Sequence, residues 1–170
     1  MDFQNRLSHS ALIRYGAFLL AGALLLGGCA FVGSSGGQRL PSVPAAFVTD
    51  SGTTEVTVEI ARRSEERQIG LMDRTEMPEN HGMLFVYDSP RPPHSGFWMH
   101  RTLIPLDIAY MDENNVILNI QQMKPCPSFL AIRCPTYYAD VSYTNVVEMN
   151  EGFFRAHNIS VGDRLEVAEQ

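Results

Sequence analysis

Four charged side chains in apolar surroundings are the residues best placed to do chemistry in this sequence. Arg67 lies in a short helical segment that begins at Ser64, and Arg74 follows this segment, while Asp107 and Glu148 lie at or within apolar, strand-like stretches. A buried carboxylate must find a partner or take up a proton, so we expect one or two arginine–carboxylate pairs. The alternative is a polar pocket in which these groups bind a small ligand, or in which Asp107 and Glu148 act as acid and base.

The run Trp98-Met99-His100 is a second grouping with chemical potential. On a strand, Trp98 and His100 share one face and Met99 points to the other. Thioether, imidazole and indole together suit Cu(I), which makes Met99 and His100 candidate metal ligands. Methionine also fills irregular cores, and most methionines here stand in apolar runs. We favour that interpretation and expect no cofactor.

Trp98 follows Phe97 and a proline-rich loop, Ser89 to Pro93. A tryptophan beside such a loop can stack on a sugar ring, but a lone tryptophan is also good core material, and we favour the core. The sequence contains no Gly-rich phosphate loop, His-Glu-x-x-His, Gly-x-Ser-x-Gly or Cys-x-x-Cys signature.

The first 28 residues have the pattern of an export signal. Basic residues precede an apolar run from Ala17 to Leu26, which is too short to span a bilayer but typical of a signal peptide. Leu26-Gly27-Gly28-Cys29 then resembles the lipobox of bacterial lipoproteins, in which the cysteine is acylated and becomes the first mature residue. We therefore expect a lipid on Cys29 and a periplasm-facing protein of the cell envelope. Ala30 in place of aspartate favours the outer membrane over the inner membrane.

Residues 29–50 are rich in Gly, Ser and Pro and are interpreted as the lipidated cysteine followed by a flexible tether, which would hold the domain roughly 25 Å from the membrane. Removing residues 1–28 takes away two basic residues and one acid, and leaves 11 basic against 18 acidic residues. Such an acidic chain argues against nucleic acid and against anionic lipid head groups as partners. Membrane attachment is therefore assigned to the acyl chains on Cys29.

Cys126 and Cys134 remain once Cys29 carries the lipid. An even pair in an oxidising compartment predicts a disulfide that closes a short loop. A redox pair or a metal site is the alternative, although the spacing is not that of the usual redox motif.

Residues 51–170 are expected to form one domain of many short strands. Strands are predicted over 55–62, 83–87, 96–100, 106–111, 116–123, 144–149 and 164–167, with short helices from Ser64 and over 151–157. We expect a mainly β (α+β) fold, a small single-domain barrel or sandwich with two short helices.

An ordered set of motifs then resembles the DUF192 family, a domain of unknown function. The motifs are Arg67-Gln-Ile-Gly70-Leu71-Met72-Asp-Arg74, Gly82-Met83-Leu84-Phe85, Phe97-Trp98-Met99, Thr102-Leu-Ile-Pro105-Leu106-Asp107, Val147-Glu148-Met149-Asn150-x-Gly152 and Gly162-Asp163. They span about Val56 to Val167. The resemblance implies a compact, mainly β domain and no established activity. His100-Arg101 departs from the family, which has Lys or Arg and then Asn before the threonine.

Three functions remain open at this point. We favour a non-catalytic ligand-binding or accessory lipoprotein that takes a small molecule or a glycan, with an unknown protein partner. The alternatives are an envelope hydrolase or lyase that uses Asp107 and Glu148, and a Cu(I)-handling module that uses Met99 or His100. The candidate ligand-binding residues are Arg67, Arg74, Trp98, His100, Thr102 and Asp107.

Overall fold

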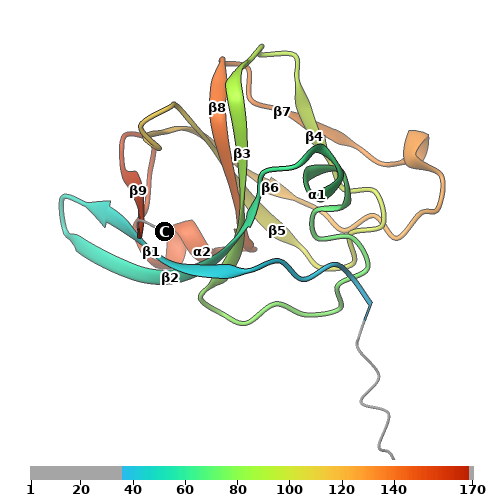
Figure 1. The fold of residues 1–170 in the computed structure, drawn as a ribbon, viewed down its shortest axis with the longest axis horizontal. Helices are drawn as coiled ribbons and strands as arrows, with labels where there is room; N and C mark the ends of the chain where they lie inside the picture. Colours follow the sequence, from blue (N-terminus) through green and yellow to red (C-terminus); the bar gives the residue numbers. More distant parts are fainter. Residues whose placement is uncertain (1–35, 169–170) are drawn as a thin grey trace, which may run out of the picture. The chain divides into compact units, whose positions relative to one another are not determined.

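The computed structural model describes residues 36–168 as a mainly β domain (Figure 1). The predicted leader and Cys29 lie outside these residues. The elements are β1 Ser42–Thr49, β2 Gly52–Ala61, α1 Ser64–Ile69, β3 His81–Arg91, β4 Gly96–Trp98, β5 Leu106–Met111, β6 Ile117–Met123, a 3-10 turn Ala131–Arg133, β7 Thr136–Tyr138, β8 Tyr143–Asn150, α2 Phe153–Ala156 and β9 Arg164–Val167.

Seven strands form one curled sheet in the order β6-β5-β8-β3-β2-β1-β9, and β4 pairs with β7 in a separate ribbon. All neighbours in the large sheet are antiparallel except β2 and β3, which α1 connects. The two edge strands approach each other, because the Ile117 N–H donates to Asp163 O at 2.8 Å and the Leu165 N–H to Asn115 O at 3.1 Å. The predicted class, a small barrel or sandwich with two short helices, is confirmed as a half-barrel.

The sheet is buried on both faces. Its concave inner face packs against α2 through a core that includes Phe47, Val58, Phe153 and Phe154. Its outer face is covered by α1, the β4–β7 ribbon and their connecting loops, over Met83, Phe85, Leu106, Ile108 and Tyr110. Because successive side chains of a strand point to opposite faces of the sheet, neighbouring residues of one strand belong to different cores.

The tether prediction is wrong for residues 42–49, which form β1 between β2 and β9. Val43, Ala45 and Phe47 alternate toward the inner core, a strand pattern that the surrounding prolines and glycines obscured. Attachment begins even earlier, because the Leu40 N–H donates to Glu59 Oε2 at 2.7 Å.

The Ser89–Pro93 loop prediction is also wrong in part. β3 continues through Pro90 to Arg91, which pairs with Tyr143 after a register shift. An irregularity of this kind is where a strand tolerates proline.

The disulfide prediction is confirmed: Cys126 is bonded to Cys134. The methionines behave as core residues, with Met83, Met99, Met111, Met123 and Met149 almost fully buried. Met99 lies in the outer core while His100 is partly exposed, so the two side chains do not form a common site for copper.

Candidate functional site

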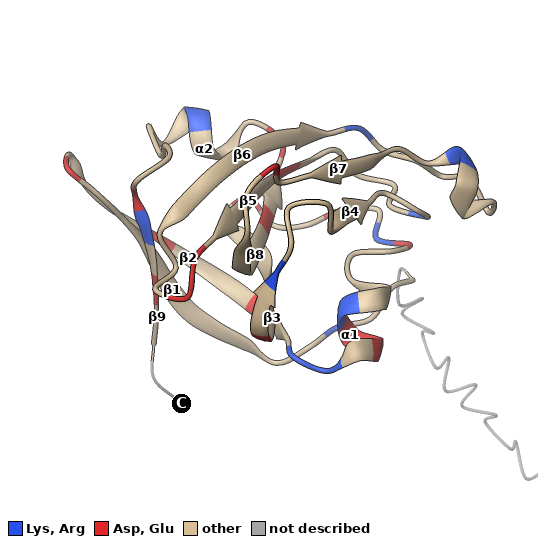
Figure 2. Cartoon of the chain, turned by 90° about the horizontal axis from the view of Figure 1, so that it is seen from above, with Lys and Arg blue, Asp and Glu red and all other residues tan. Residues whose placement is uncertain are grey.

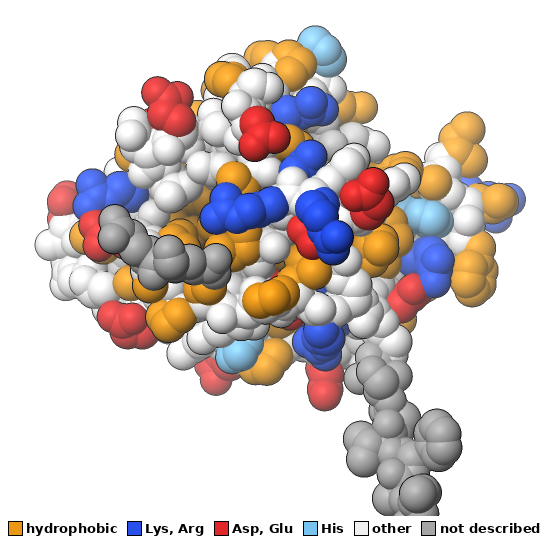
Figure 3. Space-filling view, viewed as in Figure 1, with side chains coloured by type: hydrophobic (Ala, Val, Ile, Leu, Met, Phe, Trp, Pro, Cys, Tyr) orange, Lys and Arg blue, Asp and Glu red, His pale blue; other side chains and the backbone are white. Residues whose placement is uncertain are grey.

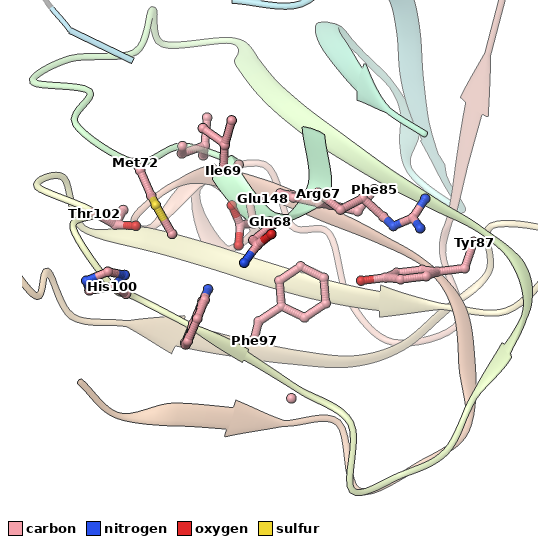
Figure 4. A pocket seen from close by; sticks show the side chains of 14 residues that line it. Arg67, Gln68, Ile69, Met72, Phe85, Tyr87, Phe97, His100, Thr102 and Glu148 are labelled. Carbon is pink, nitrogen blue, oxygen red and sulfur yellow. The ribbon is translucent and has the colours of Figure 1, made fainter. Parts of the chain in front are cut away.

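A cavity of about 100 Å³ opens between α1, β4 and the outer face of the sheet (Figure 4). Helix α1 and the turn after it form one wall, β4 and the residues after it form the other, and β3 and β8 supply the floor. The lining residues are Arg67, Gln68, Ile69, Gly70, Leu71, Met72, Phe85, Tyr87, Gly96, Phe97, Trp98, His100, Thr102 and Glu148.

Among the residues that line the cavity, Glu148 is the only one with a carboxyl group. β8 pairs it with Met83 on β3 and with Ile108 on β5, so its side chain leaves the outer face of the sheet. It is 5% exposed, and no hydrogen bond or ion pair from residues 36–168 reaches its carboxyl group. Burial raises the pKa of Glu148 to about 8, against the opposing effect of the Arg74 charge. The carboxyl group is therefore mainly protonated at neutral pH and can both donate and accept a hydrogen bond.

Aromatic rings make up much of the remaining wall. Phe97 packs edge-on against Phe85 with ring centroids 5.1 Å apart, and Trp98 lies 5.5 Å from the His100 ring. Trp98 and His100 share a face, as predicted, but the core assignment of Trp98 is wrong, because the side chain is 42% exposed. β4 is only three residues long and lies outside the main sheet, which leaves the indole uncovered.

Arg67 fixes the rim of the cavity. Its guanidinium donates to Val86 O at 3.1 Å and to Arg62 O, and lies 4.7 Å from the centroid of the Tyr87 ring. The expected arginine–carboxylate pair is wrong for Arg67. It connects α1 to β3 through carbonyl oxygens and an aromatic face.

Arg74 and Asp107, both predicted ligand-binding residues, do not line the cavity. Arg74 is 1% exposed and forms a bidentate pair with Glu59, both N–O distances being 2.7 Å. Glu59 was not among the predicted site residues, because it alternates with the apolar residues Val58 and Ile60 of β2. The face of β2 that carries Glu59 is covered near the end of the strand, where Ala61 is fully buried.

Asp107 lies on the opposite face of the sheet from Glu148. β5 pairs Asp107 with Met149 and Ile108 with Glu148. Because successive side chains alternate between the two faces of a sheet, the two carboxylates point to opposite faces. Asp107 Oδ2 accepts a hydrogen bond of 2.9 Å from the Gly152 N–H. Burial raises the pKa of Asp107, and hydrogen bonds from the backbone of Gly152 and Phe154 oppose this. The hypothesis of an acid–base pair of Asp107 and Glu148 is therefore wrong, and Asp107 has a structural role before α2.

The geometry brings together four of the predicted site residues: Arg67, Trp98, His100 and Thr102, with Glu148 from the catalytic candidates. Gln68 and Tyr87 were missed. Neither carried a sequence signal, because Gln68 stands on an exposed helix turn and Tyr87 at the end of an apolar strand.

Comparison with known proteins identifies the family. Residues 46–167 match the DUF192 family, described as "Uncharacterized ACR". The chain belongs to this family. Among solved structures, a Sinorhizobium meliloti protein described as a candidate transcription regulator is 31% identical with a TM-score of 0.67, over 78% of this chain and 98% of that one. A second similar structure is that of a Novosphingobium aromaticivorans protein of unknown function, which is 32% identical with a TM-score of 0.65, over 75% of this chain and 86% of that one.

No curated protein matches the chain. Within residues 36–168, no helix is long and apolar enough to cross a membrane. The same residues contain no cluster of three or more His, Cys, Asp or Glu side chains suited to a metal ion.

Proposed function

We propose that this DUF192 protein is a cell-envelope lipoprotein, anchored through Cys29, whose domain binds the end group of a neutral polar ligand in the cavity around Glu148. A sugar is the ligand class that fits best. The sequence of the leader supports the anchor, and the Cys126–Cys134 disulfide is a bond that persists in oxidising compartments outside the cytoplasm. Ala30 favours the outer membrane.

One observation carries the binding site: the buried carboxyl group of Glu148, which has no partner among residues 36–168, is directed into the cavity (Figure 4). The exposed Trp98 indole lines the same cavity. Buried polar groups are normally hydrogen-bonded, and an exception calls for an explanation. A ligand hydroxyl that hydrogen bonds to Glu148 supplies the missing partner.

The chemistry of the lining favours a sugar over an ion. A protonated Glu148 and the Thr102 hydroxyl can each donate and accept hydrogen bonds, as sugar hydroxyls do. The Trp98 ring offers an apolar surface for the face of a pyranose. Arg67 at the rim disfavours a cation, and its guanidinium already donates to the Val86 and Arg62 carbonyl oxygens, which leaves it less able to bind a phosphate. Because a cavity of about 150 Å³ holds one benzene molecule, the cavity of about 100 Å³ holds only an end group, with the rest of the ligand lying over Trp98.

Binding fits the cavity better than hydrolysis. Most glycoside hydrolases place two carboxyl groups about 5–9.5 Å apart across the scissile bond. Glu148 is the acidic residue among those lining the cavity, and Asp107 lies behind the sheet. A role in transcription regulation, which the S. meliloti protein is named for, is disfavoured for this chain where it requires DNA binding, because the mature chain is acidic.

The test of binding uses the intrinsic fluorescence of Trp98, since the chain has one tryptophan. We expect N-acetylglucosamine oligomers or glucose to shift its emission, with spermidine and inorganic phosphate producing no change. Glu148→Leu removes the hydrogen-bonding group and should weaken binding at least about tenfold. Asp107→Asn is the matched control on the opposite face and should bind as wild type does. Unchanged emission with every sugar, or equal affinity in Glu148→Leu, would contradict the site.

The anchor has a separate test. Cells fed radiolabelled palmitate should label the wild-type chain and not Cys29→Ser. Labelling of neither chain would refute lipidation without bearing on the cavity.

A further inference from the structure

The loop between the two bonded cysteines, residues 127–133, exposes three large apolar side chains. Phe129 is 86% exposed, Leu130 55% and Ile132 94%. We call these seven residues the apolar loop. It projects from the side of the domain beyond the β4–β7 ribbon (Figure 1). Single exposed apolar residues are common, but a contiguous group of this kind marks an interaction site.

The apolar loop is held in a fixed shape. The disulfide closes it, and the Cys126 N–H donates to Thr102 O at 2.9 Å. Within it, a 3-10 turn spans Ala131–Arg133, and the Leu130 N–H donates to Ser128 Oγ at 3.1 Å. The apolar side chains are therefore displayed by an ordered backbone.

The chain enters the domain on the same side as the apolar loop. Gly36 lies beside Asp73, and Asp73 pairs with Arg101, whose Nε lies 3.0 Å from Asp73 Oδ1. The neighbouring His100 ring contacts Phe129 O at 3.3 Å. Figures 1 and 2 both show the start of the described chain on the side of the loop.

Little chain separates this side from the proposed anchor. The first residue with a firm contact to the domain is Gln38, whose carbonyl accepts from Arg74 Nη2 at 2.6 Å. From Cys29 to Gln38 the chain can span at most about 30 Å. An anchored domain is therefore kept near the bilayer with this side facing the bilayer.

The local charge also suits a membrane surface. The exposed Arg133 belongs to the apolar loop, and the exposed Lys124 precedes it, although the mature chain as a whole is acidic. Figure 3 shows apolar side chains and basic groups together along the right-hand edge of the domain. Apolar side chains beside Lys or Arg are the composition of segments that lie in the membrane interface.

We propose that the apolar loop inserts Phe129, Leu130 and Ile132 into the interface of the membrane that carries the Cys29 lipid. This rests on the proposed lipid anchor. The loop is a second contact that fixes the orientation of the domain. Because His100 both lines the cavity and contacts the loop, that orientation brings the mouth of the cavity close to the membrane surface.

The test bypasses native lipidation so that the two proposals fail separately. Both cores are built from residues within 36–168, so the chain from Cys29 onward contains all of the packing needed to fold. Its Cys29 thiol, free because the other two cysteines are bonded, is coupled to a maleimide lipid in vesicles of phosphatidylethanolamine and phosphatidylglycerol. A Trp98→Phe background removes the native tryptophan, and Ile132→Trp places a reporter in the loop. Val161→Trp, at a position 61% exposed in the turn before β9, is the matched control.

Brominated phospholipids in these vesicles should quench the Ile132→Trp reporter at least about fivefold more than the Val161→Trp reporter. Adding Phe129→Ser and Leu130→Ser to the loop reporter should reduce its quenching to the control value. Equal, low quenching at both positions would overturn the proposal and leave the loop to a protein partner. Quenching that persists in the serine variant would overturn it as well, because the apolar side chains would then not drive the contact.

Discussion

Among the residues that cover the outer face of the sheet, loss of the Arg74 guanidinium should lower the free energy of unfolding the most. Its two hydrogen bonds to Glu59 and a third to Gln38 O connect β2, the loop after α1 and the start of the described chain. The Arg74 side chain is 1% exposed and that of Glu59 is 9% exposed. Without Arg74, the buried Glu59 carboxylate keeps only the Leu40 N–H and the half-exposed Arg39, whose Nη1 lies 3.9 Å away. Breaking a buried pair by removing one member costs about 3–5 kcal/mol.

Arg74→Met keeps the volume and removes the charge, so the free energy of unfolding should fall by about 3–5 kcal/mol and Tm by roughly 12–20 °C for a domain of this size. Urea and thermal unfolding at pH 7 measure both quantities. The double variant Arg74→Met/Glu59→Leu should recover most of the loss, because no unpaired charge remains.

The matched control is Arg164→Gln, which breaks the pair with Glu166 between side chains that are 50% and 53% exposed. It should cost less than about 1 kcal/mol. If Arg74→Met costs no more than Arg164→Gln, the reasoning from burial is refuted.

Two further predictions concern strands β3 and β8. The folded-state pKa of Glu148, about 8, lies above its ordinary value of 4.5, so its contribution to stability is present below pH 4.5 and is lost as the pH rises through about 8. Glu148→Gln should remove that loss and be more stable than wild type at pH 9 by on the order of 5 kcal/mol, the value that corresponds to a pKa raised from 4.5 to about 8; equal pH profiles in urea unfolding would contradict this. A Cβ on Gly82 would lie 2.5 Å from Glu148 O and against Met149 Sδ, so Gly82→Ala should cost about 1–3 kcal/mol. Gly36→Ala, which meets only ordinary contacts, is its control.

The strands with clear alternation or long apolar runs were predictable, because a period of two is a local property of the chain. β5 and β9 were predicted with the bounds that the structure shows. β1 was missed because Pro41, Pro44 and the preceding glycines dominated the composition, while the alternation of Val43, Ala45 and Phe47 was short. β7 has three residues and carries too little pattern to detect.

The site residues were harder to predict because their neighbours depend on strand order and register. Glu148 and Asp107 both look like buried carboxylates in the sequence. Only the pairing of β5 with β8 shows that they face opposite cores. Arg74 was expected to pair with a carboxylate, but its partner Glu59 lies on β2, and the alternating sequence of β2 predicts only one buried face. The structure buries both faces at the end of this strand. The exposure of Trp98 depends on where the β4–β7 ribbon ends.

The most direct test of the cavity as the ligand site is chemical-shift mapping of the ¹⁵N-labelled domain during titration with a sugar that shifts Trp98 emission. We expect perturbations concentrated at the Trp98 indole N–H and at the backbone N–H groups of Gln68, Gly70, Phe97 and Thr102, with Gly152 on the opposite face of the sheet unmoved. Perturbations that gather instead around α2, or spread evenly over the surface, would show that this cavity does not bind the ligand.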